Sequence, residues 1–379
     1  MAKCDALWIP EQKAGKTILV FNKSGSAEEG TSERYPTVKH RFLLAGMVIV
    51  VCGVCSSVFA TDATLLAISG RKMTAEQAAS IEKQVAQNPD DVDSRTQLLG
   101  YYFGKQFQDP AVRIAKQKNI LWLIENAPAA GILRSPFGQL DAILDGAAYT
   151  QGKQAWEKQL KQDPQNLKLL ENSANYFLIH DRDLAKVSLQ QAQALDGKNP
   201  QWPAALGQLY LLEMMTNSLQ PQSEVASQAL AQLEIAYNLS TERAQENLLQ
   251  YLAKAAFAAK QPEKATAYAE KMLSLDGNGW NAGNNQHQGN IILGKLALAA
   301  GNVEEAKQRL LKAGKTSGSP QLNSFGPDMT LAKALLQQDE KEVVLEYLVL
   351  CSKFWTLGKT RLDQWTEIVK NDQIPSDWR

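Results

Sequence analysis

The chain has 379 residues, of which 44% are hydrophobic and 21% charged, a composition that is typical of a folded protein and excludes a largely disordered one. Its 40 Lys and Arg residues balance its 40 Asp and Glu residues, so it lacks the basic excess of a dominant nucleic-acid-binding protein. The length leaves two organisations, either two globular domains or one extended repeat array.

The N-terminal region has the order of charge and apolarity of an export signal. Residues 1–41 are a polar leader, rich in Gly, Ser, Lys and Glu, which we expect to be disordered. Residues 42–60 (FLLAGMVIVVCGVCSSVFA) are an uncharged run that directly follows a basic flank. This run is either the hydrophobic core of a cleaved signal peptide or an uncleaved membrane anchor, in which case residues 1–41 are a cytoplasmic tail.

Both alternatives place the remainder of the chain, residues 61–379, outside the cytoplasm, because the basic flank stays inside. We therefore expect a periplasmic or secreted protein, which residues 42–60 anchor to the inner membrane if they are uncleaved and which contacts the membrane through no other segment. Within residues 61–379 a single cysteine, Cys351, and two histidines, His180 and His287, remain. A disulfide framework, a multi-histidine metal site and a cofactor are accordingly not expected.

From Thr74 onward the apolar residues recur with the helical period, and Pro, Gly and Asp-containing turns interrupt them at short intervals. Many of the predicted helices share one pattern, a large apolar residue followed by a small one, with an aromatic or apolar residue three positions later. It occurs at Leu99-Gly100, Leu206-Gly207, Leu252-Ala253, Leu293-Gly294 and Leu331-Ala332. The small residue lets one helix of a hairpin lie close to its neighbour, and the large residues fill the seam.

This pattern resembles the tetratricopeptide repeat, a helical hairpin of about 34 residues. The best copy runs from His287 to Pro320, and the spacing between copies is irregular. Residues 61–379 are therefore predicted to be all-α, a tetratricopeptide-like solenoid of helical hairpins with degenerate repeats. The amphipathic stripe of Leu362, Trp365 and Val369 would form a C-terminal capping helix.

Two segments resemble a group of poorly characterised bacterial exported proteins with tetratricopeptide-like repeats. These are Gly289–Trp355, which includes GNIILGKLAL and VVLEYLVLCSKFW, and Asn119–Pro128 (NILWLIENAP). The resemblance implies a bacterial exported solenoid and supplies no catalytic residue.

No catalytic motif emerges from the sequence. Gly314-Lys315-Thr316 resembles the end of a phosphate-binding loop, but Arg309 stands where the first glycine of that motif belongs. Carboxylates are scattered singly, without the pairing that acid–base catalysis uses. We therefore expect a protein that is not an enzyme.

The leading hypothesis is a scaffold of the cell envelope that binds a peptide or helix of a partner protein on the concave face lined by the first helix of each hairpin. Tyr101, Gln208 and Lys295, each two positions after the large residue of the pattern, are the predicted contacts on that face. A third possibility is self-assembly of the repeats.

The alternative is an enzyme or small-ligand binder with its site in a long polar surface loop predicted at 277–289, through Trp280, Asn284, Asn285 and His287. We favour the plainer interpretation of this loop, a tolerated insertion, over a binding role. A buried polar cluster around His287 would favour the ligand-binding alternative, and a smooth concave face would favour the scaffold.

Overall fold

The computed structural model describes residues 62–216, 222–275 and 279–378. Across these ranges the chain forms seventeen α-helices and three short 3-10 helices and no β-strand, which confirms the predicted all-α class. The predicted leader at 1–41 and the apolar run at 42–60 lie outside the described residues. Among the helices that are described, none combines the length and the apolarity needed to cross a membrane.

The first third of the described chain is a group of helices that ends in an irregular segment. Its elements are α2 (Asp62–Gly70), α3 (Ala75–Gln87), α4 (Val92–Lys105), α5 (Pro110–Asn126), η2 (Gly131–Arg134) and η3 (Pro136–Gly138). Side-chain caps fix the helix starts: Thr74 and Gln77 form a capping box on α3, and the Asp91 carboxylate accepts from the backbone N–H of Ser94 at 2.9 Å. Helix α4 is the centre of this group, because α2, α3 and α5 all pack against it.

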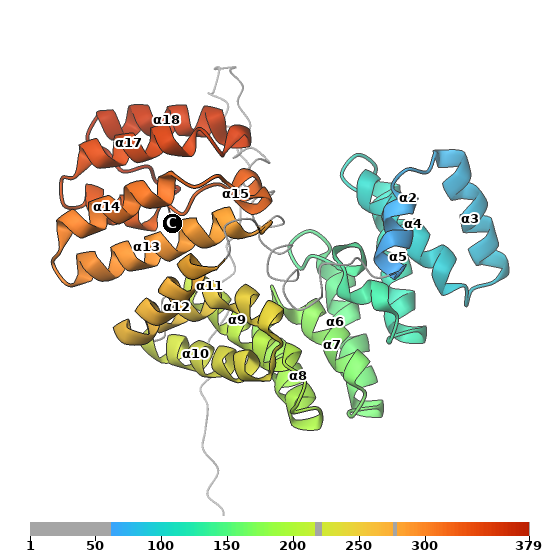
Figure 1. The fold of residues 1–379 in the computed structure, drawn as a ribbon. Helices are drawn as coiled ribbons and strands as arrows, with labels where there is room; N and C mark the ends of the chain where they lie inside the picture. The colour runs from blue at the N-terminus through green and yellow to red at the C-terminus, as the bar shows by residue number, and fades with distance from the viewer. Residues whose placement is uncertain (1–61, 217–221, 276–278, 379) are drawn as a thin grey trace, which may run out of the picture. The chain divides into compact units, whose positions relative to one another are not determined.

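Antiparallel helices in series make up the rest (Figure 1). They are α6 (Gly146–Gln162), α7 (Leu167–Phe177), α8 (Arg182–Leu195), α9 (Gln201–Thr216), α10 (Gln222–Leu239), α11 (Glu242–Ala258), α12 (Pro262–Ser274), α13 (Ala282–Ala299), α14 (Val303–Gly314), α15 (Pro320–Phe325), α16 (Thr330–Leu336), α17 (Lys341–Cys351), η4 (Thr356–Gly358) and α18 (Lys359–Lys370).

Contacts between these helices follow the chain order. Each of α7, α9, α11 and α13 packs against the helix that follows it, and each resulting pair packs against the next pair. The first helices of the pairs also meet directly, α9 with α11, α11 with α13, and α13 with α16. At the C-terminal end α14, α17 and α18 lie alongside one another in Figure 1, in orange and red.

One turn geometry recurs within three of the pairs. Lys260, Gly301 and Asp339 adopt left-handed backbone conformations with φ of 58°, 80° and 62° directly after α11, α13 and α16. The backbone N–H of the next residue closes each turn: Gln261 donates to the carbonyl oxygen of Ala256, Asn302 to that of Ala297 and Glu340 to that of Leu335, at 2.9 to 3.1 Å. This is the Schellman closure of a helix C-terminus, and its acceptors all lie four positions after the large residue of the sequence pattern.

Apolar residues from the pattern form the core. Leu99, Leu206, Leu252 and Leu331 are fully buried and Leu293 is 8% exposed. Cys351 is also fully buried, as expected for a small core residue. Two apolar clusters share the described chain, one from Ala67 to Leu293 and one from Ile291 to Trp378, and α13 contributes to both.

Candidate functional site

The predicted polar segment 277–289 is largely helical rather than a loop. Helix α13 begins at Ala282, so Asn284, Asn285 and His287 lie in its first two turns, and all three side chains are buried. The start of the helix packs closely against the segment that follows α14, because a Cβ built at Gly283 would lie 1.8 Å from the carbonyl oxygen of Gly318. Trp280 stands ahead of the helix and is 54% exposed. The expectation of a long surface loop is therefore wrong over its second half.

His287 is the centre of a buried polar cluster that joins α13 to two later segments. Its side chain is fully buried, and Nδ1 lies 3.1 Å from the carbonyl oxygen of Ala313 while Nε2 accepts from the backbone N–H of Asp328 at 3.0 Å. Burial, opposed by Asp328, holds the pKa of His287 below its ordinary value. The neutral tautomer protonated on Nδ1 satisfies both contacts, so this ring has no nitrogen left for a ligand.

Asp328, in the turn before α16, carries the negative charge of this region. Thr330 donates to Oδ1 of Asp328 from its backbone N–H at 3.0 Å and from its hydroxyl at 2.6 Å. Nζ of Lys254, on α11, lies 3.7 Å from Oδ2. Burial alone would raise the pKa of Asp328, but Lys254 and the Thr330 hydrogen bonds together hold it below its ordinary value. The carboxylate is therefore ionised, and only one of its oxygens is saturated by hydrogen bonds.

Lys295, another of the predicted contacts, is half-buried on α13. Its Nζ lies 4.4 Å from the ring centroid of Phe257 on α11, a cation–π distance. Burial holds its pKa below the ordinary value and nearby Lys254 acts in the same direction, while Asp328 opposes them. No hydrogen-bond acceptor or ion-pair partner for Lys295 is found in the described part of the chain. The result is a half-buried ammonium that lacks an anionic partner in direct contact.

The amide side chains nearer the start of α13 form some hydrogen bonds within the chain. Asn284 donates from Nδ2 to Oε1 of Gln250, on α11, at 3.2 Å, and Asn285 accepts from Asn281 at 3.0 Å. Gln288 is 9% exposed, and its Oε1 has no hydrogen-bond partner. We call the set Gln250, Lys254, Gln288, Lys295 and Asp328 the polar seam of α11 and α13.

The other two predicted contacts lie elsewhere. Gln208, on α9, is only 4% exposed because α8, α10 and α11 all pack against that helix, so a predicted contact of the concave face is buried in the free chain. Neither atom of its amide has a hydrogen-bond partner. Tyr101 is half-buried on α4, with its ring 5.9 Å from that of Tyr102. Since α4 packs against α2, α3 and α5, the structure does not bring Tyr101 together with Lys295.

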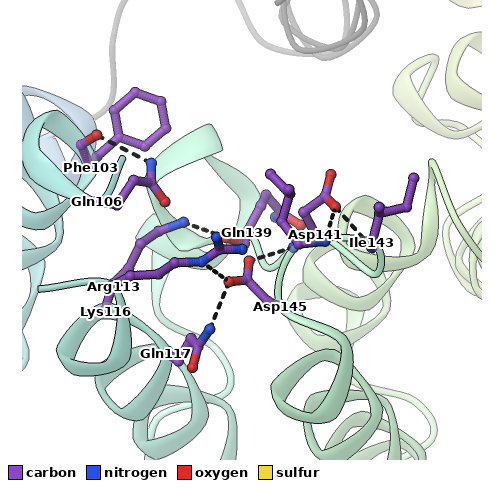
Figure 2. Close-up of polar contacts among 10 residues, drawn as sticks. Phe103, Gln106, Arg113, Lys116, Gln117, Gln139, Asp141, Ile143 and Asp145 are labelled. Atoms are coloured by element: carbon purple, nitrogen blue, oxygen red, sulfur yellow. Dashed lines mark hydrogen bonds and ion pairs between the residues drawn. The ribbon is translucent and has the colours of Figure 1, made fainter. Parts of the chain in front are cut away.

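A second buried polar cluster was not foreseen from the sequence. Arg113, Lys116 and Gln117 extend from one face of α5 toward the segment that precedes α6 (Figure 2). Arg113 Nε and Gln117 Nε2 donate to Oδ1 of Asp145 at 2.8 and 2.7 Å. Lys116 Nζ donates to the backbone oxygen of Gln139 at 2.9 Å.

Lys116 is unusual because its ammonium is almost completely buried. The residue is 5% exposed, and burial lowers its pKa to about 8, an effect that Asp145 opposes. Its partner is a backbone carbonyl, and both the Lys116 and Asp145 contacts tie irregular chain to α5. The cluster therefore anchors the segment between η3 and α6 rather than presenting an amine to a substrate. The sequence did contain a signal, because Lys116 and Gln117 follow Arg113 by three and four positions and so share one face of α5. A charged helix face is usually exposed to solvent, however, so this spacing alone did not indicate a buried cluster.

The side chains described above offer charges and hydrogen-bonding groups to a ligand. No group of His, Cys, Asp and Glu side chains in the described ranges could hold a metal ion. Burial raises the pKa of the Cys351 thiol well above its ordinary value, so this cysteine is no nucleophile. Compared with known proteins, the chain matches no protein-family model and no curated protein. The polar seam is therefore the candidate functional site.

Proposed function

We propose that this protein is a tetratricopeptide-like solenoid that acts as a non-catalytic binding scaffold and holds an extended acidic segment of a partner protein on the face formed by α9, α11 and α13. The observation that carries the proposal is the half-buried ammonium of Lys295 on α13, which lies over the Phe257 ring of α11 and has no anionic partner in direct contact among the described residues. Recurrent turns after α11, α13 and α16 and direct contacts among the first helices of successive pairs support the solenoid arrangement.

Unsatisfied polar groups along these helices support a polypeptide ligand. A buried amide without a hydrogen bond destabilises a fold by about 1–3 kcal/mol, yet Gln208 leaves both its amide atoms unpaired and Gln288 leaves its carbonyl oxygen unpaired. They lie on α9 and α13, on either side of α11. These amide atoms are enclosed in the free chain, so a peptide would reach them only after the side chains turn outward, and it would then offer them one donor and one acceptor per residue.

Charge supports an acidic ligand. Lys254 and Lys295 face a single carboxylate, that of Asp328, so the seam has a net charge of +1 with His287 neutral. A ligand carboxylate near Lys295 would supply the missing partner, and its partial shielding from water would strengthen the interaction. The aromatic ring of Phe257 beneath the ammonium fixes its position.

Fluorescent peptide pools test this proposal. Peptides of about 12 residues with Asp and Glu at every third position should bind the full chain, and otherwise identical pools with Asn and Gln should bind at least roughly tenfold more weakly. The double variant Lys254→Gln/Lys295→Gln should abolish the difference, whereas Lys312→Gln, on α14, should preserve it. Equal binding of both pools, or unchanged binding by the double variant, would exclude an acidic peptide as the ligand.

A small-ligand binder remains the second candidate, because the buried cluster around His287 is the feature expected for it. Both ring nitrogens of His287 are already bonded within the chain, which favours a structural role for this cluster. We further propose export of residues 61–379 to the periplasm or the medium, on the basis of the basic flank and apolar run at residues 42–60. Mass spectrometry of the N-terminus isolated from cells would distinguish cleavage after Ala60 from a retained anchor.

A further inference from the structure

A hollow of about 370 Å³ lies where the end of α12, the first half of α13 and the end of α14 come together. On α13, Ala282, Gln286 and Asn290 line it; their spacing of four residues places them on one side of the helix. The volume is within the range of about 300–1,000 Å³ that is usual for small-molecule sites.

Two cations on α14 face this hollow. Arg309 is held in place by a 2.6 Å bond from Nε to Glu305 and a 3.4 Å contact from Nη1 to the Asn290 oxygen. Asn290 is itself fixed, since it is 4% exposed and donates to the backbone oxygen of Gln286. Lys312 has no ion-pair partner within the described ranges. With Glu305 neutralising only one of the two cations, the hollow has a net charge of +1.

Apart from Ser317, the remaining wall is apolar. Met272, which is 1% exposed, and the half-buried Leu273 and Leu275 contribute it from the end of α12. A ligand that suits this hollow needs an anionic group for Arg309 and Lys312 and a short apolar part for the α12 side. A guanidinium held by two partners and a free ammonium beside it both suit carboxylate and phosphate oxygens.

We propose that this hollow is a binding site for a small amphiphilic anion, a carboxylate or a phosphate monoester on a short hydrocarbon chain. The site is separate from the polar seam. Successive helical residues are rotated by about 100°, so Gln286, which lines the hollow, and Gln288, which belongs to the seam, point to opposite sides of α13. The proposal therefore does not depend on the peptide-binding function.

Calorimetric titration of the full chain with hexanoate, hexyl phosphate and hexan-1-ol tests the site. At least one of the two anions should bind, and hexan-1-ol should bind at least roughly tenfold more weakly. Binding of hexanoate alone would assign a carboxylate ligand, and binding of hexyl phosphate alone would assign a phosphate. Failure of both anions, or equal binding of the alcohol, would overturn the proposal.

Three variants locate the binding. Arg309→Gln should weaken binding of the anion roughly tenfold or more, and Lys312→Gln at least roughly threefold. Lys315→Gln, just beyond the end of α14, should leave the dissociation constant unchanged. Since Arg309 also supports Asn290, Lys312→Gln decides the matter: Lys312 is exposed, so its variant keeps the fold. Unchanged anion binding by Lys312→Gln would overturn the assignment.

Discussion

The backbone N–H of Asp328 donates to Nε2 of His287 at 3.0 Å, across 41 residues of sequence. This bond and the contact between Nδ1 and the Ala313 carbonyl oxygen fasten α13 to the last turn of α14 and to the turn that follows α15. The same turn carries the Asp328 carboxylate toward Lys254. His287 thereby positions the charged part of the polar seam without being part of the exposed surface.

Acid should destabilise the fold through His287. Its pKa in the folded protein is below the ordinary value of 6.5, so below that pH the unfolded chain binds a proton that the folded chain does not. The free energy of unfolding should therefore fall between pH 7 and pH 5, by up to about 1.4 kcal/mol per pH unit for this group. His287→Gln should be less stable at pH 7 but should vary less with pH. Urea unfolding at several pH values measures both slopes, and identical slopes would contradict the buried neutral histidine.

Raising the pH should remove the free-energy cost of burying the charged ammonium of Lys116. Its pKa is lowered from 10.5 to about 8, so between these values the unfolded chain binds more protons and the stability contributed by this residue rises with pH. Relative to Lys116→Met, the wild type should gain about 2 kcal/mol between pH 8 and pH 9.5. Guanidinium unfolding of both proteins gives the difference. Parallel stability curves over this interval would show that the ammonium is solvated.

Two glycines of α4 should respond oppositely to alanine. A Cβ at Gly100 would lie 1.7 Å from the backbone oxygen of Ala67, whereas one at Gly104 would meet nothing within 4 Å. Gly100→Ala should destabilise the protein by about 2 kcal/mol or more and increase hydrogen exchange of α2. Gly104→Ala should stabilise it by about 0.5–1 kcal/mol through helix propensity. Similar effects of the two substitutions would mean that α2 does not pack closely on α4.

A leucine at position 208 should increase the stability of the free protein and weaken peptide binding. Replacing Gln208 with leucine removes a buried amide that has no hydrogen bonds, so the free protein should become more stable by about 1–3 kcal/mol. Binding of the acidic peptide pool should weaken at the same time. Thermal unfolding and fluorescence anisotropy on the same samples test this. A variant that is less stable than the wild type would indicate that Gln208 is satisfied within the fold.

Helical periodicity and small residues at fixed positions were sufficient to predict the all-α class and the helices that carry the pattern. Leu293 and Ala306, for example, lie in α13 and α14 as the best copy of the repeat requires. The start of α13 was missed because Gly, Asn and Gln are common in loops. Tertiary packing decided that segment instead, through the close approach of Gly283 to Gly318.

The candidate site was foreseen only in part. Lys295 follows its leucine by two positions, and Lys254 has the same relation to Leu252, so the pattern contained a signal for both lysines. Asp328 had no such signal, because a hydrogen bond to a histidine distant in sequence brings it to the seam. The Lys116 cluster could not be predicted either. The irregular segment between η3 and α6 buries it, and the spacing of residues along α5 does not reveal that contact.

Site-specific photocrosslinking in the source cell tests the central claim most directly. A photoreactive phenylalanine analogue in place of Phe257, beneath Lys295, should form an adduct with another polypeptide, and the same analogue at Gln286 should not. Adding Lys254→Glu and Lys295→Glu should abolish the adduct at position 257. Equal adducts at both positions, or an adduct that survives the charge reversal, would contradict recognition of an acidic partner segment on the face of α9, α11 and α13.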